Sequence, residues 1–343
     1  RLVFVDGVYA PELSTHAGEA RGLSVTNIAS AKGEIAQLGH VARFDNDVFC
    51  ALNTSFLHDG ALVAIRKNIS YPAPVHLLFI ATQKESVAYP RCLVVAEAGS
   101  QGVLIEEYVS LFEDVHFTNA VSEIMVGENA RVHHIRLQHE SAGSFHIAHC
   151  AATLAKDAHY ISDSVTFGAR LSRYNLNVTQ AAPGARCELN GLALISGRQL
   201  ADTHSSIDHA QPHGVSRQLH KCIAGGAAHA VFNGKVMVRP GAQLTDSAQS
   251  SRNLLLSGKA HVDTKPQLEI FADDVKCAHG ATVGQLDAEE VFYLRSRGLD
   301  EAHAKRVLTY AFAAEIIDKI PVASLARRLK QKVMQQTQMR EPA

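Results

Sequence analysis

The chain of 343 residues has no tryptophan, no long apolar run and no excess of either charge. Lys and Arg number 33 against 34 Asp and Glu, and this balance excludes a dedicated nucleic-acid binder, which needs a basic excess. No run approaches the roughly 20 apolar residues of a membrane-spanning helix, so no membrane insertion is predicted. P-loop, G-x-S-x-G and G-x-G-x-x-G motifs are also missing, so ATP hydrolysis and acyl transfer have no support within the chain.

The six cysteines lie far apart, and no two form a C-x-x-C pair. This spacing is typical neither of a small disulfide framework nor of a zinc ribbon. No charged-then-apolar leader follows Arg1. We therefore expect free thiols, mostly small buried side chains, in a protein of the reducing cytoplasm.

Many short strands are predicted through the centre of the chain. Residues 133–139 alternate, with Ile135 and Leu137 on one face and polar side chains on the other, and residues 174–179 and 262–264 continue the pattern. This period of two is typical of half-buried strands.

Small residues recur in the turns between these strands. Ala130, Ala158 and Ala185 follow one another at nearly equal intervals, whereas the step from Ala242 to Ala260 is shorter. A small residue at each corner is what the stacked coils of a β-solenoid require, since a bulky one would hold the coils apart. The pattern thus favours a parallel β-helix, with a β-sandwich or jelly roll as the alternative.

The C-terminal part of the chain, from Asp287 onward, indicates helices. Asp287 can cap a first helix that ends at Gly298, Asp300 can cap a second that ends before Pro321, and residues 322–339 are basic and amphipathic. The second helix is expected to bury one face, made of Leu308, Ala311, Phe312 and Ile316. We therefore divide the chain into an N-terminal lead-in (1–57, a strand plus a partly helical segment), a β-helix core (58–286) and a C-terminal helical domain (287–343).

The block from Lys265 to Gly284, which contains Cys-Ala-His-Gly-Ala-Thr-Val-Gly, and the following Tyr-Leu-Arg-Ser-Arg-Gly resemble the C-terminal core signature of the SufB/SufD family. The form of these motifs favours the SufD branch over SufB. The entry strand Leu2–Gly7 and the segment from Phe49 to Phe79 agree with the same family, so the resemblance covers nearly the whole chain.

The resemblance implies a mainly β protein, a right-handed parallel β-helix with a small C-terminal helical domain. It also implies a non-catalytic scaffold of the SufBCD complex for iron–sulfur cluster assembly. Such a subunit pairs with a SufB-like paralogue through the β-helix ends and binds a SufC-like ABC-type ATPase through its C-terminal helices. Two copies could pair where the SufB-like subunit is missing. A transient iron–sulfur cluster, shared with the SufB-like partner and not held stably by the isolated chain, would use His279 and the nearby Cys277.

The chemistry of these two residues suits that role. Cys277 and His279 are two positions apart, so on a strand both side chains project from one face. A thiolate and an imidazole are both ligands for iron. An iron–sulfur cluster usually has four protein ligands, so the other two would come from a partner. The alternative is a buried Cys beside a hydrogen-bonded core His. For Asp273 and Asp274, a solvated turn is favoured over an iron-binding role.

The C-terminal helices carry aromatic and Arg side chains of the kind enriched at interfaces. We expect Tyr293, Leu294, Arg297 and Tyr310 to contact the ATPase partner, although some of the apolar ones would pack the helical domain's own core.

The 19 histidines keep a rival hypothesis open, a His-dependent metalloenzyme on a β-solenoid. His133 and His139 share a face, but the strand between them separates them by about 20 Å, too far for one ion. Most histidines are expected to hydrogen-bond between coils. A second rival is a purely structural solenoid that only positions the ATPase.

Overall fold

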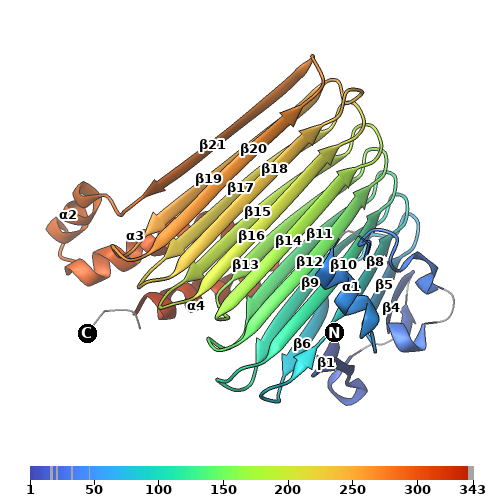
Figure 1. Ribbon diagram of the computed structural model, residues 1–343, viewed down its shortest axis with the longest axis horizontal. Coiled ribbons are helices and arrows are strands. Elements are labelled where there is room, and N and C mark those ends of the chain that lie inside the picture. The colour runs from blue at the N-terminus through green and yellow to red at the C-terminus, as the bar shows by residue number, and fades with distance from the viewer. Residues whose placement is uncertain (16–17, 21, 32–33, 46, 339–343) are drawn as a thin grey trace.

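The computed structural model describes residues 1–15, 18–20, 22–31, 34–45 and 47–338. The chain winds between two facing sheets, and each turn of the chain, here called a rung, adds one strand to each sheet (Figure 1). Neighbouring strands of successive rungs are parallel and in register, for example Phe145 with Leu171 and His229 with His261. The predicted parallel β-solenoid is therefore confirmed, and the sandwich and jelly roll, which pair antiparallel strands, are excluded.

The two sheets run the length of the stack. In spatial order, the ten-stranded sheet consists of β2 (Val8–Tyr9), β1 (Leu2–Val5), β6 (Val75–Ala81), β9 (Gln101–Ser110), β11 (Arg131–His139), β13 (His159–Thr166), β15 (Arg186–Ile195), β17 (Val215–Ala224), β19 (Thr245–Leu255) and β21 (Val275–Gly284). The eleven-stranded sheet consists of β20 (His261–Ile270), β18 (His229–Val238), β16 (Leu200–His209), β14 (Leu171–Gln180), β12 (Phe145–Leu154), β10 (Phe117–Val126), β8 (Arg91–Ala96), β5 (Ala61–Ile65), β4 (Leu23–Asn27) and β3 (Gly18–Ala20), with β7 (Val87–Ala88) beside β10.

Buried alanines form corners between the sheets, as the need for small residues predicts. Ala130, Ala158 and Ala185 belong to one core cluster, and each is at most 1% exposed. The shorter step in the sequence has a different origin: Ala242 lies between β18 and β19, whereas Ala260 lies between β19 and β20. These two alanines therefore occupy opposite ends of the same strand, and the shorter step does not mark a shorter rung.

Strand β11 is buried on both faces, although its alternating pattern predicts a half-buried strand. The polar His134 and Arg136 point into the solenoid and are at most 1% exposed. Ile135 and Leu137 instead face outward and pack against the C-terminal helices. The prediction fails because a sequence pattern cannot show that a distant segment covers the outer face of a strand.

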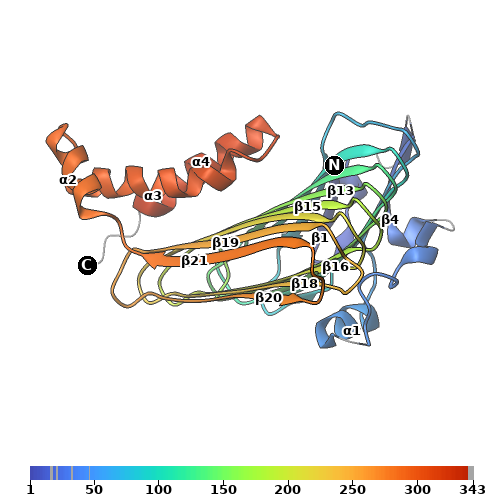
Figure 2. The ribbon, with the colours of Figure 1, turned by 90° about the horizontal axis from the view of Figure 1, so that it is seen from above.

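In the described part of the chain, three helices follow β21: α2 (Ala288–Ser296), α3 (Glu301–Ile317) and α4 (Ala323–Gln338). Helices α3 and α4 lie along the outer face of the ten-stranded sheet (Figure 2), where Ile316 and Leu329 contact the core cluster of that face. Asp287 and Asp300 cap α2 and α3 as predicted. The predicted buried face of α3 is partly wrong, because Ala311 is exposed. The buried positions of α3 are Ala304, Thr309, Ala313, Ile316 and Ile317.

None of the helices within the described residues combines the length and the hydropathy needed to span a bilayer.

The outer face of the eleven-stranded sheet carries α1 (Val48–Ser55), preceded by the 3-10 turns η1 (Pro11–Leu13), η2 (Ile28–Ser30) and η3 (Glu34–Gln37). A buried ion pair holds this cover in place: Arg91 Nη2 lies 2.5 Å from Glu123 Oε1, and neither side chain is more than 1% exposed. Glu123 also accepts backbone N–H bonds from Gly39, Val41 and Ala42, so this carboxylate fixes the segment before α1.

Replacing Glu123 by Gln tests this arrangement. The substitution would leave the buried Arg91 without a counter-charge, and we expect the free energy of unfolding to fall by about 3–5 kcal/mol. Urea unfolding followed by circular dichroism measures the change. The matched control is Asp246→Asn, which breaks an exposed ion pair with Arg217 and should cost less than about 1 kcal/mol. Equal losses in the two variants would contradict the role given to Glu123.

Candidate functional site

The last rung of the solenoid is uncovered. Strands β20 and β21 end their sheets, and within the described residues no further strand pairs with their outer edges (Figure 1). The inward side chains Ser247, Gln249 and Ser251 of β19 are at most 3% exposed, whereas their partners on β21 are exposed or half-buried. A long strand whose edge is unpaired is a ready template for another chain.

The two predicted ligands lie on this rung. Cys277 is in register with Ser247 and His279 with Gln249, so both side chains belong to the inner face of β21, as their spacing predicts. Cys277 is half-buried and packs against the core, whereas His279 is exposed. The next residue, Gly280, faces the opposite side of the strand, where a Cβ built on it would meet no atom within 4 Å.

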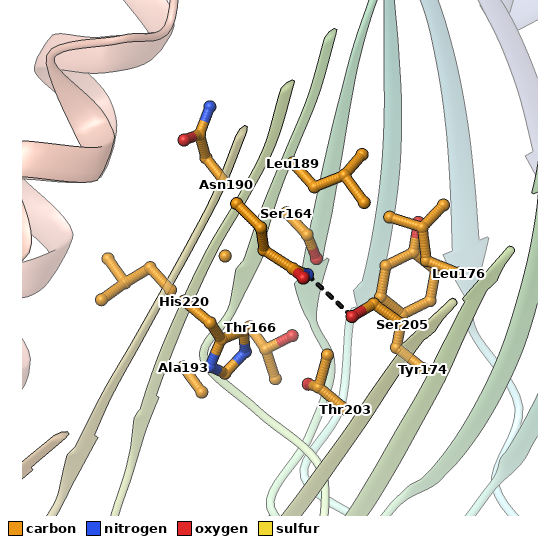
Figure 3. Close-up of a pocket in the computed structure, with 13 residues that line it drawn as sticks. Ser164, Thr166, Tyr174, Leu176, Leu189, Asn190, Ala193, Thr203, Ser205 and His220 are labelled. Carbon is orange, nitrogen blue, oxygen red and sulfur yellow. Dashed lines mark hydrogen bonds between the residues drawn. The ribbon is translucent and has the colours of Figure 1, made fainter. Parts of the chain in front are cut away.

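Polar side chains line the interior beneath His279, whose register partner on β19 is Gln249. Gln249 Nε2 donates to Gln218 Oε1 at 2.7 Å, and Gln218 Nε2 donates to Ser205 Oγ at 2.7 Å, the latter beside a small cavity of about 20 Å³ (Figure 3). Among the described atoms, the buried Gln249 Oε1 has no hydrogen-bond partner, so an acceptor lies one rung beneath His279.

The electrostatics of Cys277 bear on its use as a ligand. Burial raises the pKa of its thiol, and the charge of Asp246 adds to the increase. The thiolate is therefore a minor species at neutral pH until a positive charge approaches. Neither Cys277 nor His279 belongs to a group of three ligands within the described part of the chain. This position therefore offers two candidate ligands from this chain, fewer than a cluster needs.

Asp273 and Asp274 form the turn that precedes β21. Both are exposed, and the backbone of Asp274 is fixed by the carboxamide of Gln243, which accepts from its N–H at 2.9 Å. These contacts fit the solvated turn that the sequence favoured.

The predicted ATPase-contact residues separate into two pairs. Tyr293 of α2 and Arg297, the residue that follows the helix, are exposed, with the guanidinium of Arg297 5.2 Å from the centre of the Tyr293 ring. Leu294 is half-buried, and Tyr310 on α3 packs against the cluster beneath the helices. Helix α2 buries none of its residues and extends beyond the sheet (Figure 2).

Several histidines hydrogen-bond between coils, as the sequence predicts. His133 Nε2 lies 2.6 Å from Asp163, and His159 Nε2 lies 3.2 Å from Glu188 on the next rung. His220 differs: it lies inside the solenoid, and burial lowers its pKa to about 3, so it stays neutral.

Sequence reasoning missed the apolar rim of the open rung. Ile270 and Phe271, where β20 ends, are 39% and 62% exposed, and Val283, where β21 ends at the other side of the rung, is 46% exposed. Their signal in the sequence is that no later strand of the described residues covers this rung, and this is visible only once the rungs have been counted.

Comparisons with known proteins agree with this architecture. A family model described as the SufBD core domain of the SUF system for iron–sulfur cluster assembly matches residues 79–312. An iron–sulfur cluster assembly SufBD family protein of Synechocystis is 45% identical over 96% of this chain and 76% of its own length. The iron–sulfur cluster assembly protein SufD of Escherichia coli is 37% identical over 98% of this chain and 78% of its own length. A chloroplastic protein of Arabidopsis thaliana is 36% identical over 82% and 61%, respectively.

The fold and the uncovered rung define a β-solenoid protein whose last strands are open to another chain. The similarity extends over nearly the whole length of that solenoid and its helices. The chain belongs to the SufB/SufD family of iron–sulfur cluster assembly proteins.

Cysteine labelling tests the geometry of the open rung. Of the six cysteines, five are buried and only Cys277 is partly exposed, so iodoacetamide should modify Cys277 first in the native protein. Since its pKa is raised, the reaction should be slower than that of free cysteine at pH 7.5. Below that pKa, the rate should rise about tenfold per pH unit with the thiolate fraction. Mass spectrometry of the labelled peptides identifies the site, and Cys277→Ser is the control. Earlier labelling of another cysteine would contradict this assignment.

Proposed function

We propose that this chain is a non-catalytic scaffold subunit that forms a nascent-cluster site together with a SufB-like chain. The observation that carries the proposal is the position of Cys277 and His279 on the inner face of an uncovered rung. Two ligands at an open edge suit a cluster that is completed by a second chain and then transferred. When the two chains separate, the cluster loses the ligands of the partner and is held less tightly.

The edge itself supports a partner with the same fold. Backbone N–H and C=O groups of β20 and β21 can pair only with strands that run alongside them, and a second solenoid end supplies two such strands. The exposed Ile270 and Phe271 at one end of the rung and Val283 at the other give this surface apolar parts, and the exposed His279 gives it a polar one. A SufB-like paralogue, or a second copy of this chain where the paralogue is missing, is therefore the expected occupant.

Helix α2 supports a separate contact with a SufC-like ATPase. Its Phe292 and Tyr293 are 70% and 57% exposed, although α2 is joined to a well-packed pair of helices. Large aromatic side chains in such a position are typical of interface hot spots. Since α3 and α4 rest on the ten-stranded sheet, movement of a partner bound to α2 would be transmitted to β21. A cytoplasmic location remains part of this proposal, and the Arabidopsis relative is named as chloroplastic.

Cluster production tests the ligand role. We would co-express the chain with the ATPase and the SufB-like protein, purify by a tag on this chain, and measure iron and acid-labile sulfide. His279→Ala should remove most of the sulfide while the complex still forms, and Cys277→Ala should lower it. The control is His58→Ala, an exposed histidine outside the strands. Unchanged sulfide in His279→Ala would instead favour the purely structural solenoid.

A pair of variants tests the two partner surfaces independently. Tyr293→Ala on α2 should lower the affinity for the ATPase at least tenfold and leave the SufB-like pairing intact, because hot-spot truncations cost about 2 kcal/mol or more. Phe271→Asp on the open rung should do the reverse. Co-purification and surface plasmon resonance measure both affinities. Loss of both partners in either variant, with folding intact, would contradict the separation of the surfaces.

A further inference from the structure

A second group of ligand-type side chains lies on the outer face of the eleven-stranded sheet. His229 opens β18 and His261 opens β20, and the two are paired in register. Asp263 follows two residues after His261, so it projects from the same face. This face lies on the side of the solenoid away from α3 and α4 (Figure 2), whereas Cys277 and His279 lie on the inner face of the other sheet.

The three side chains converge on one point. His229 Nε2 lies 2.7 Å from Asp263 Oδ2, and His261 Nε2 lies 3.0 Å from Asp263 Oδ1. The ring centres are 5.1 Å apart, and the three candidate ligand atoms all lie within 4.8 Å of one another. Ligands around a zinc-like ion with bonds near 2.1 Å are about 3.4 Å apart, so small side-chain rotations would admit an ion.

This group differs from the single histidine–carboxylate pairs of the solenoid and from the buried Glu140, which contacts both His116 and His146 but is shielded from solvent. His133 with Asp163 and His204 with Asp202 each join one imidazole to one carboxylate, and two ligands do not hold an ion well. The exposed fractions of His229, His261 and Asp263 are 43%, 66% and 58%, so an ion could enter directly from solvent.

The other three-ligand group in the described residues is less suitable. It consists of Asp47, Cys50 and His149 beneath α1. Asp47 Oδ1 already accepts the first N–H groups of the helix, and burial raises the pKa of Cys50 to about 12, which keeps the thiol protonated. The proximity of Asp47, Cys50 and His149 is therefore explained by the packing of α1 on the sheet.

We propose that His229, His261 and Asp263 form an exchangeable site for a divalent transition-metal cation. Two imidazoles and one carboxylate are a donor set for Fe²⁺, Co²⁺ or Zn²⁺, and they leave coordination positions open to water. Two of the three residues, His261 and Asp263, lie on the edge strand β20, so a chain that continues the solenoid could add a further ligand. That the natural cation is ferrous iron rests on the proposed function; binding of a divalent cation by the three residues does not.

Cobalt(II) titration of the full-length, metal-stripped chain tests the proposal. Co²⁺ bound to nitrogen and oxygen ligands gives visible absorption bands, and we expect saturation at one equivalent. His261→Ala, His229→Ala and Asp263→Asn should each weaken Co²⁺ binding at least tenfold. His204→Ala is the matched control, an outer-face histidine of the same sheet that contacts a single carboxylate, and it should bind as the wild type does. Circular dichroism confirms that each variant is folded.

Two outcomes would overturn the site. One is a wild-type chain that binds no Co²⁺ at millimolar concentration, and the other is binding that survives both His261→Ala and Asp263→Asn. Competition of Co²⁺ with Zn²⁺, and with Fe²⁺ under anaerobic conditions, then ranks the cations by their affinity for the site. The titration uses neither partner nor cluster, so its failure leaves the proposed function standing. Conversely, an unchanged sulfide content in the His279→Ala variant would not contradict this metal site.

Discussion

The structure depends on one constraint: every rung satisfies the backbone hydrogen bonds of the rung before it. A parallel strand cannot pair with its own sequence neighbour, so the chain must cross to the facing sheet and return before it adds the next strand. The corners must then be small, and the buried alanines meet that need. Among the described residues, the same constraint leaves the final rung with two unpaired edges, since its hydrogen-bonding partner would have to come from a further rung. The candidate site thus follows from where the stack ends.

The two outer faces are covered by different means. Apolar side chains of α3 and α4 bury the outer face of the ten-stranded sheet, and a Lys221–Glu315 ion pair adds charge to this contact. On the other sheet the Arg91–Glu123 pair holds the segment before α1. On the open rung, His261 and Asp263 of β20 are exposed on the outer face, while β21 carries Cys277 and His279 on its inner face at the open edge. The open rung therefore contributes residues to both candidate sites.

The interior carries charge as well as apolar side chains. Burial by itself would lower the pKa of His134, but hydrogen bonding to Cys150 and Glu106 raises it to about 9. Burial would likewise raise the pKa of Glu106, yet His134 holds it at about 2. The two groups therefore stay charged as a pair inside the solenoid. Loss of either member would leave the other as an unpaired buried charge and would strongly destabilise the fold. The pair therefore restricts which residues the middle rungs accept at these positions.

The sequence by itself determined the strands, the corner alanines, the helix caps at Asp287 and Asp300, and the common face of Cys277 and His279. All of these depend on near neighbours in the chain, where periodicity and capping act directly. Only the tertiary structure decided that both faces of β11 are buried, that Ala311 points to solvent, and that His229 meets His261 and Asp263. Those outcomes depend on segments that are distant in the chain. The rungs also differ in length, as the pairings of Phe145 with Leu171 and of His229 with His261 show, and this variation hides the register from a linear pattern.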